Sequence, residues 1–406
     1  MPSGLLHRCA RCKPQAGGDG AGDTVSEELM ALWLSNSPPA TSESESELRA
    51  QYIATSDALE ILKSQNRELS TSSKSLEEAL ARITEKKRIY HSILHPIRRL
   101  PPETLVEISR ICTFGDALTG QFPGSLDTRR APWKLTQVCR AWRSVSASAS
   151  SLWTRVSIYK SWGPTVSASR MASLEALLSI QLERSRGQAL SLSYEPGRVP
   201  ATSNEPPYER LFSMLCSRAS QWETAQLTIV VDGLGPLRDI CGGLCSLKRL
   251  EINFERDEWS SDSISACRAF EDCPSLTQLI LRGEAQDILQ REIRIPWRQI
   301  THYEATLDDV WMPNLESHFQ SLPKLESLEV CILGSSSDDS DSFRAFLHSP
   351  LKLHFLHTLV TSDADDFDMG MLLSWLILPA LRVLRFFGRF SHPAKLLECL
   401  DRSQCS

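Results

Sequence analysis

Two regular patterns of apolar residues organise the chain, and the first lies in its N-terminal third. From Leu48 to Leu94, alternating steps of four and three residues land on an apolar residue at ten of fourteen positions, with no proline or glycine in between. A repeat of about 3.5 residues held this long is typical of a helix that packs a seam against another helix. The pattern predicts one long amphipathic or coiled-coil helix over 48–94, ended by Pro96, which lacks an amide hydrogen.

The partner of that seam is left open by the sequence. In one interpretation the helix folds back on its own domain, and in the other it forms a coiled coil with a second copy of the chain, giving a homo-oligomer through 48–94. Sedimentation of this segment separates the two, because a helix with an intramolecular partner stays monomeric.

The second pattern fills the C-terminal half. Four segments share the frame Leu-x-x-Leu-x-apolar, three weaker segments lie between them, and successive starts are 24 to 31 residues apart. The seven frames begin at Trp222, Leu247, Leu276, Ile300, Leu325, Leu356 and Leu381. This spacing is close to that of leucine-rich repeats, roughly 20–29 residues, in which a short strand directs alternate side chains into a shared core. An irregular leucine-rich-repeat solenoid over 160–406 is therefore predicted, and an ordinary parallel α/β sheet is the alternative.

The intervening residues 97–158 predict a small helical domain. Pro101 and Pro102 suit the first turn of a helix, and a second helical stripe follows from Trp133 to Val145. Trp153, Val156 and Ile158 then lead into a strand. Residues 1–47, rich in glycine, serine and acidic residues, predict a mostly disordered leader. Its apolar island, Leu29–Leu34, predicts a short docked helix capped by Ser26. The fold class expected for the whole chain is multi-domain α and α/β.

Composition narrows the functional classes. The 406 residues exceed the roughly 250–300 at which single hydrophobic cores stop growing. The 44 basic against 50 acidic residues leave no basic excess, so we expect no nucleic-acid binding. No apolar run has the length of a signal peptide or a membrane span. Twelve scattered cysteines fit reduced thiols in an intracellular protein, cytoplasmic or nuclear.

No catalytic motif is present, so we expect no enzyme and no cofactor. Gly115–Gly120 has the glycine spacing of a phosphate-binding loop, but Gln121 and Phe122 replace the lysine and the hydroxyl residue that such a loop needs. Cys9 and Cys12 offer two thiolates, yet a structural zinc site usually needs four ligands, and a free, reduced pair is the favoured interpretation. No metal is expected.

One further motif points to a family. The segment Ile97-Arg98-Arg99-Leu100-Pro101-Pro102-Glu103, followed by Val138-Cys139-Arg140-x-Trp142-Arg143 and Leu152-Trp153, resembles the F-box, in particular that of F-box-like proteins of mushroom-forming fungi. The leading Arg8-Cys9-x-x-Cys12, the segment Ala131-Pro132-Trp133 and the repeat-like half belong to the same resemblance. One departure is the segment Phe114–Arg130, which is longer than the connection in an ordinary F-box.

The resemblance implies a substrate-recruiting subunit of an SCF-type cullin-RING ubiquitin ligase. Its F-box docks a Skp-type adaptor, and its repeats bind a protein substrate that the sequence does not identify. The residues that this resemblance makes adaptor-facing, or core of the domain, are Leu100, Pro101, Leu105, Ile108, Val138, Trp142, Leu152 and Trp153. The alternative is a ligase-independent scaffold that self-associates through 48–94.

Overall fold

The computed structural model describes most of the chain between residues 25 and 404. The segments outside the description within that range are 36–38, 69–73, 116–123, 160–166, 196–207, 231–234, 239, 241, 256–266, 284–292, 308–314, 333–349, 364–365 and 388–392. Cys9 and Cys12 also lie outside the described residues, as does most of the predicted leader.

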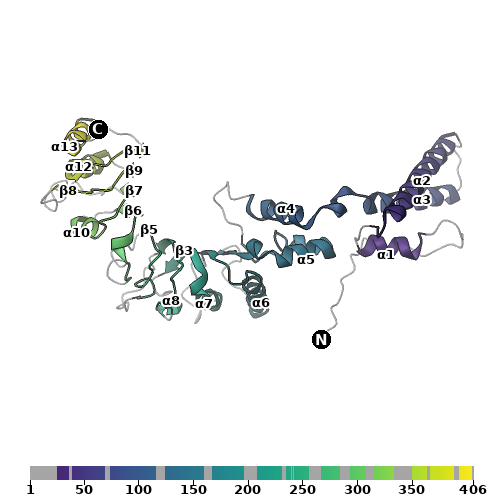
Figure 1. Cartoon of the computed structure of the whole chain (residues 1–406), viewed down its shortest axis with the longest axis horizontal. Coiled ribbons are helices and arrows are strands. Elements are labelled where there is room, and N and C mark those ends of the chain that lie inside the picture. The colour runs from purple at the N-terminus through teal and green to yellow at the C-terminus, as the bar shows by residue number, and fades with distance from the viewer. Residues whose placement is uncertain are drawn as a thin grey trace. The chain divides into compact units, whose positions relative to one another are not determined.

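The chain forms two compact units, each described by itself below. The first comprises 1–108 and 135–146, and the second comprises 109–134 and 147–406. The predicted F-box-like segment 97–158 is thus shared between them. Figure 1 shows the helices of the first unit and the sheet of the second.

The first unit begins with three helices, α1 (Glu27–Ser35), α2 (Ser42–Glu68) and α3 (Lys74–Ile93). The predicted cap of α1 is confirmed, because the Leu29 amide donates to Ser26 Oγ at 3.2 Å. Helix α2 begins inside the predicted leader, where the Ser44 amide donates to Thr41 Oγ1 at 3.1 Å. A hydroxyl cap and acidic residues in the first turn stabilise the start of a helix. The prediction of a disordered leader rested on overall composition, which does not register such local signals.

The single helix predicted over 48–94 is instead two helices packed against each other. Tyr90 donates its hydroxyl hydrogen to Gln51 Oε1 at 2.7 Å, although the two residues are 39 positions apart. Residues so far apart in one straight helix would lie about 58 Å from each other, at about 1.5 Å per residue. The sequence between the helices contains Ser70–Ser73, four hydroxyl residues that disfavour helix interiors. The seam therefore has an intramolecular partner.

The core of these helices joins all three. Its buried members are Leu29, Leu48, Ile89, Tyr90 and Ile93. Ile53 and Ile61 of α2 are exposed and could contact a second copy of the chain. Self-association through this segment stays a prediction.

The F-box-like segment contains helices α4 (Pro102–Phe114) and α5 (Arg140–Ser148). The predicted helix start at Pro101–Pro102 is confirmed. The second predicted stripe, Trp133–Val145, is broken into turns, a 3-10 helix (Leu135–Gln137) and α5. Short 3-10 helices also occur at Pro96–Arg99 and Ser150–Trp153.

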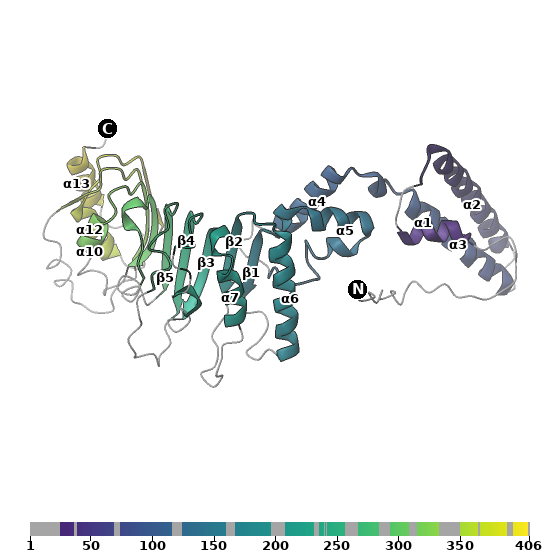
Figure 2. The ribbon, with the colours of Figure 1, turned by 60° about the horizontal axis from the view of Figure 1, so that its bottom comes forward.

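The second unit is built on a nine-stranded parallel sheet whose strands lie side by side in chain order, as Figure 2 shows for β1 to β5. The strands are β1 (Arg155–Tyr159), β2 (Leu190–Glu195), β3 (Trp222–Val230), β4 (Arg249–Glu255), β5 (Gln278–Gly283), β6 (His302–Leu307), β7 (Ser327–Ile332), β9 (Thr358–Asp363) and β11 (Val383–Phe387). A separate pair consists of β8 (Leu351–Lys352) and β10 (Leu376–Ile377).

All seven predicted frames lie on neighbouring strands of this sheet, in register. The middle apolar position of each frame pairs with that of the next, in the order Ala225, Leu250, Leu279, Tyr303, Leu328, Leu359 and Leu384. The leucines that begin four of the frames are also buried: Leu247, Leu276, Leu325 and Leu356. The frame therefore marks the side of the sheet that faces the core.

Helices cover that core side. They are α6 (Ala168–Arg184), α7 (Glu209–Cys216), α8 (Gly235–Arg238), α10 (Leu315–Gln320), α12 (Asp366–Trp375) and α13 (Pro393–Ser403). Leu174 of α6, Phe212 of α7 and Phe319 of α10 belong to one core with the strands. Between the frames, α10 connects β6 to β7, whereas Cys267, between β4 and β5, forms an isolated parallel bridge with Ile293 and is followed by turns.

The predicted mixture of α and α/β structure is confirmed at this level. The structure contains helices and one large parallel sheet, and the identification of an F-box and of a leucine-rich-repeat solenoid stays a prediction.

Candidate protein-binding surfaces

The residues predicted to face an adaptor differ widely in exposure. Pro101 and Val138 are exposed, Leu100 and Ile108 are half-buried, and Leu105 and Trp142 are buried in the first unit. Ile97, which begins the F-box-like motif but was not selected as an adaptor-facing residue, is exposed in the same unit. Its place in the motif was the available signal.

Leu152 and Trp153 belong to the core of the second unit. The exposed fraction of Trp153 is 0%, and its ring packs edge-on against Trp133 with centroids 4.8 Å apart. The Arg184 guanidinium lies 4.5 Å from the centroid of the Trp153 ring, a favourable cation–π arrangement. A side chain so enclosed has no surface to offer a partner, so we leave both residues out of the adaptor surface.

Trp142 is buried in the first unit, at the start of α5. Its amide donates to Cys139 Sγ at 3.5 Å, and Arg143 Nε donates to the Thr136 carbonyl at 2.8 Å. These contacts fix the turn before α5, where the side chain of Val138 remains 53% exposed. Val138 and Pro101 are therefore the predicted residues best placed for an intermolecular contact.

The side of the sheet opposite the helices forms a second candidate surface, which we call the open face. Strand residues alternate in direction, so the positions between the frame residues point to this face. One register row runs through Arg155, Ser191, Thr224, Arg249, Gln278 and His302. The next runs through Ser157, Ser193, Gln226, Glu251, Ile280, Glu304 and Glu329. These rows are mainly polar, whereas the core side is apolar.

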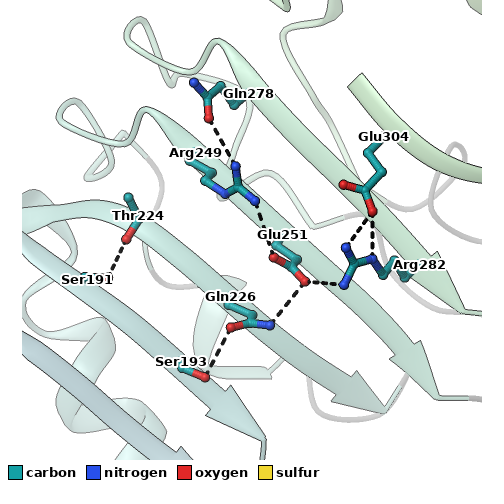
Figure 3. Close-up of polar contacts among 9 residues, drawn as sticks. All are labelled: Ser191, Ser193, Thr224, Gln226, Arg249, Glu251, Gln278, Arg282 and Glu304. Atoms are coloured by element: carbon teal, nitrogen blue, oxygen red, sulfur yellow. Dashed lines mark hydrogen bonds and ion pairs between the residues drawn. The ribbon is translucent and has the colours of Figure 1, made fainter. Parts of the chain in front are cut away.

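An ion-pair network connects three strands of the open face (Figure 3). Arg282 donates to Glu251 Oε1 through Nη1 at 2.9 Å and to Glu304 Oε1 through Nε at 3.0 Å. Gln226 Nε2 also donates to Glu251 Oε1, at 3.1 Å, so hydrogen bonds extend the network to β3. Ile280, paired in register with Glu251 and Glu304, is buried although it lies on this face.

The electrostatics of the network follow from these contacts. Burial alone would lower the pKa of Arg282, but the hydrogen bond to Glu304 and the charge of Glu251 outweigh it and raise that pKa. Burial, together with the neighbouring Glu304 charge, raises the pKa of Glu329. Arg282 therefore stays charged and compensates the two carboxylates that it bridges.

A groove of about 260 Å³ lies on the open face over β1 to β4. Its polar lining includes Arg155, Ser191, Ser193, Thr224, Arg249 and Glu251. Sequence analysis predicted none of these residues. The frames predict which positions lie on strands, but they do not predict the function of the side chains between the apolar positions. The only available signal was the parity of each position within its frame.

Two other kinds of site are not found among the described residues. No group of three or more histidine, cysteine or acidic side chains there is arranged to hold a metal ion. In the described part of the chain, no helix combines the length and apolarity needed to cross a membrane.

Comparison with known proteins does not assign a family. No protein-family model matches the chain, and the search of curated proteins gave no match.

Proposed function

We propose that this chain is a non-enzymatic, substrate-recruiting subunit of an SCF-type cullin-RING ubiquitin ligase. The proposal rests on the resemblance of 97–153 to the F-box, and its segment in the first unit would dock the Skp-type adaptor. The parallel sheet would present a protein substrate to the ligase, in the manner of leucine-rich repeats.

The observation that carries the substrate-binding half is the alignment of the seven frames. The middle residue of each frame pairs in register with the middle residue of the next frame, which is the arrangement expected of stacked repeats. Such stacking leaves a broad face of alternate side chains available for a protein partner, and the open face has this character.

The adaptor-docking half is supported by apolar side chains that stay exposed around the motif. Val138, Pro101 and Ile97 are exposed in the first unit, and exposed apolar side chains of this kind serve as anchors in interfaces. Leu105 is buried, so its replacement by a charged residue would unfold the unit and would not report on docking.

Co-purification of the full-length chain with a Skp-type adaptor tests this proposal. We expect the double variant Pro101→Ala, Val138→Asp to reduce recovery of the adaptor at least about tenfold, because a carboxylate would be desolvated in the interface. Phe355→Asp is the matched control, since Phe355 is a similarly exposed apolar residue of the second unit. Equal recovery with the wild type and the double variant would refute docking through these residues.

A further inference from the structure

The groove on the open face carries a charge arrangement that defines a ligand. Glu251 is the single acidic residue among the groove-lining residues described, and its side chain is 11% exposed. Arg282 and Gln226 both donate to its Oε1 atom. The negative charge of Glu251 is therefore compensated by Arg282, which lies on β5, on the side of β4 away from β1 and β2.

Arg249 is the cation that this arrangement leaves available. Its side chain is 46% exposed, its distance to Glu251 Oε2 is 3.9 Å, and Nη1 donates to Gln278 Oε1 at 3.3 Å. Both contacts are long, and a guanidinium has five N–H donors. Within the described part of the chain, most donors of Arg249 thus have no protein acceptor.

A second cation stands at the other side of the groove. The guanidinium of Arg155 lies 4.9 Å from the centroid of the Phe114 ring, and its side chain is half-buried. Partial burial lowers the pKa of Arg155, but an arginine remains protonated at neutral pH.

The hydroxyl groups between the two arginines complete the donor set. Thr224 Oγ1 donates to Ser191 Oγ at 2.7 Å, so the hydroxyl hydrogen of Ser191 is not used in that bond and can serve a ligand. These two residues lie on β3 and β2, in register between Arg155 and Arg249.

We propose that this groove binds an acidic segment of a partner protein through an Asp or Glu carboxylate. Arg249 donates to the carboxylate in a bidentate arrangement, Arg155 supplies a second positive charge, and Ser191 donates a hydroxyl hydrogen bond. Paired N–H donors match a carboxylate in geometry as well as charge, which favours it over a neutral amide. This inference rests on the function proposed above and names the substrate chemistry that the open face selects.

Fluorescence anisotropy with the full-length chain tests the groove directly. The probe is a short labelled peptide that alternates glutamate and serine, compared with peptides in which every glutamate is replaced by glutamine, or the acidic charge is moved to phosphoserine. We expect the glutamate peptide to bind in a salt-sensitive manner and the glutamine peptide to bind at least about tenfold more weakly. Preference for the phosphoserine peptide, with no binding of the glutamate peptide, would overturn the carboxylate assignment.

Variants then locate the binding. Arg249→Gln should weaken binding of the glutamate peptide about tenfold, Arg249→Lys should weaken it less, and Arg218→Gln should leave it unchanged. Arg218 is an exposed arginine after α7 outside the groove, so its replacement changes the net charge equally. Equal losses in Arg249→Gln and Arg218→Gln would show a non-specific charge effect and overturn the site.

The adaptor experiment keeps the two proposals separate. Arg249→Gln should co-purify with the Skp-type adaptor as well as the wild type, because Arg249 lies on the sheet of the second unit. Peptide binding without adaptor recovery would refute the ligase function and support the carboxylate-binding groove. Adaptor recovery without selective peptide binding would support the ligase function and refute the groove.

Discussion

The first and last strands of the sheet differ in how they are covered. At β1, the segment 124–134 supplies hydrogen bonds to the strand. The Ser125 amide donates to the Ser157 carbonyl at 3.0 Å, and the Ser157 amide donates to Ser125 Oγ at 3.0 Å. Gly124 fits closely, because an added Cβ would lie 2.9 Å from Tyr159 Cε1. The core-side residues of β1, Val156 and Ile158, are fully buried.

The strand β11, at the other end of the strand order, keeps much more of its surface accessible. Its core-side residues Leu384 and Phe386 are only half-buried, and on the open face Phe387 is 61% exposed. Arg385 is also exposed on the open face, and Arg382 is exposed just before the strand. Charged side chains on a terminal strand discourage pairing with other chains.

This difference changes the interpretation of the segment Phe114–Arg130. From the sequence it was a departure from the F-box pattern, too long for a connection between helices. Its described part, with Trp133, instead protects the first strand of the sheet and adds an aromatic cluster beneath it. An edge strand carries unpaired backbone groups, and such a segment protects them.

Trp153→Ala should lower the free energy of unfolding more than any other variant proposed here, because it leaves a cavity in the core beside β1. The removed ring packs on Trp133 and beneath Arg184, and truncation of a buried aromatic residue costs about 3–5 kcal/mol. Urea unfolding of the full chain, followed by hydrogen exchange in β1 and β2, measures the loss. The counterpart Phe387→Ala should cost no more than about 0.5 kcal/mol. A similar cost at both ends would contradict the proposed difference.

Ser125→Ala should have an intermediate effect. It removes the hydroxyl that accepts from the Ser157 amide, and an N–H left without its partner costs about 1–2 kcal/mol. Faster hydrogen exchange of the Ser157 amide is the expected signal. Ser213→Ala, which removes an exposed hydroxyl of α7, provides the control. Unchanged protection of Ser157 would show that the segment does not stabilise β1.

The periodic pattern of apolar residues predicted most strands of the large sheet. The seven frames identified seven of the nine strands of the large sheet, because the strand positions that face the core are apolar. It missed β2, whose core-side Leu192 and Tyr194 alternate with serines but have no frame leucine before them. The break between α2 and α3 was also missed, since the heptad count continued across Ser70–Ser73. Local helix propensity, rather than seam residues, carried that information.

The candidate surfaces were less accessible to sequence reasoning. A motif of apolar residues looks the same whether its members are core or interface, and only the structure separated buried Trp153 from exposed Val138. The groove depends on register between strands, which brings Arg155 and Arg249 to the same row although 94 positions separate them. No local pattern encodes that alignment.

Phe387→Ser should have the smallest effect on folding and sharpens the contrast with β1. Since the ring is mostly exposed, the free energy of unfolding should change by no more than about 0.5 kcal/mol. The change should instead slow concentration-dependent association, because an exposed aromatic residue on a terminal strand favours contact between chains. Light scattering of wild type and variant over a concentration series measures this, with Ser213→Ala as a surface control. A stability loss above about 2 kcal/mol would show that Phe387 is packed in solution and that β11 is covered as β1 is.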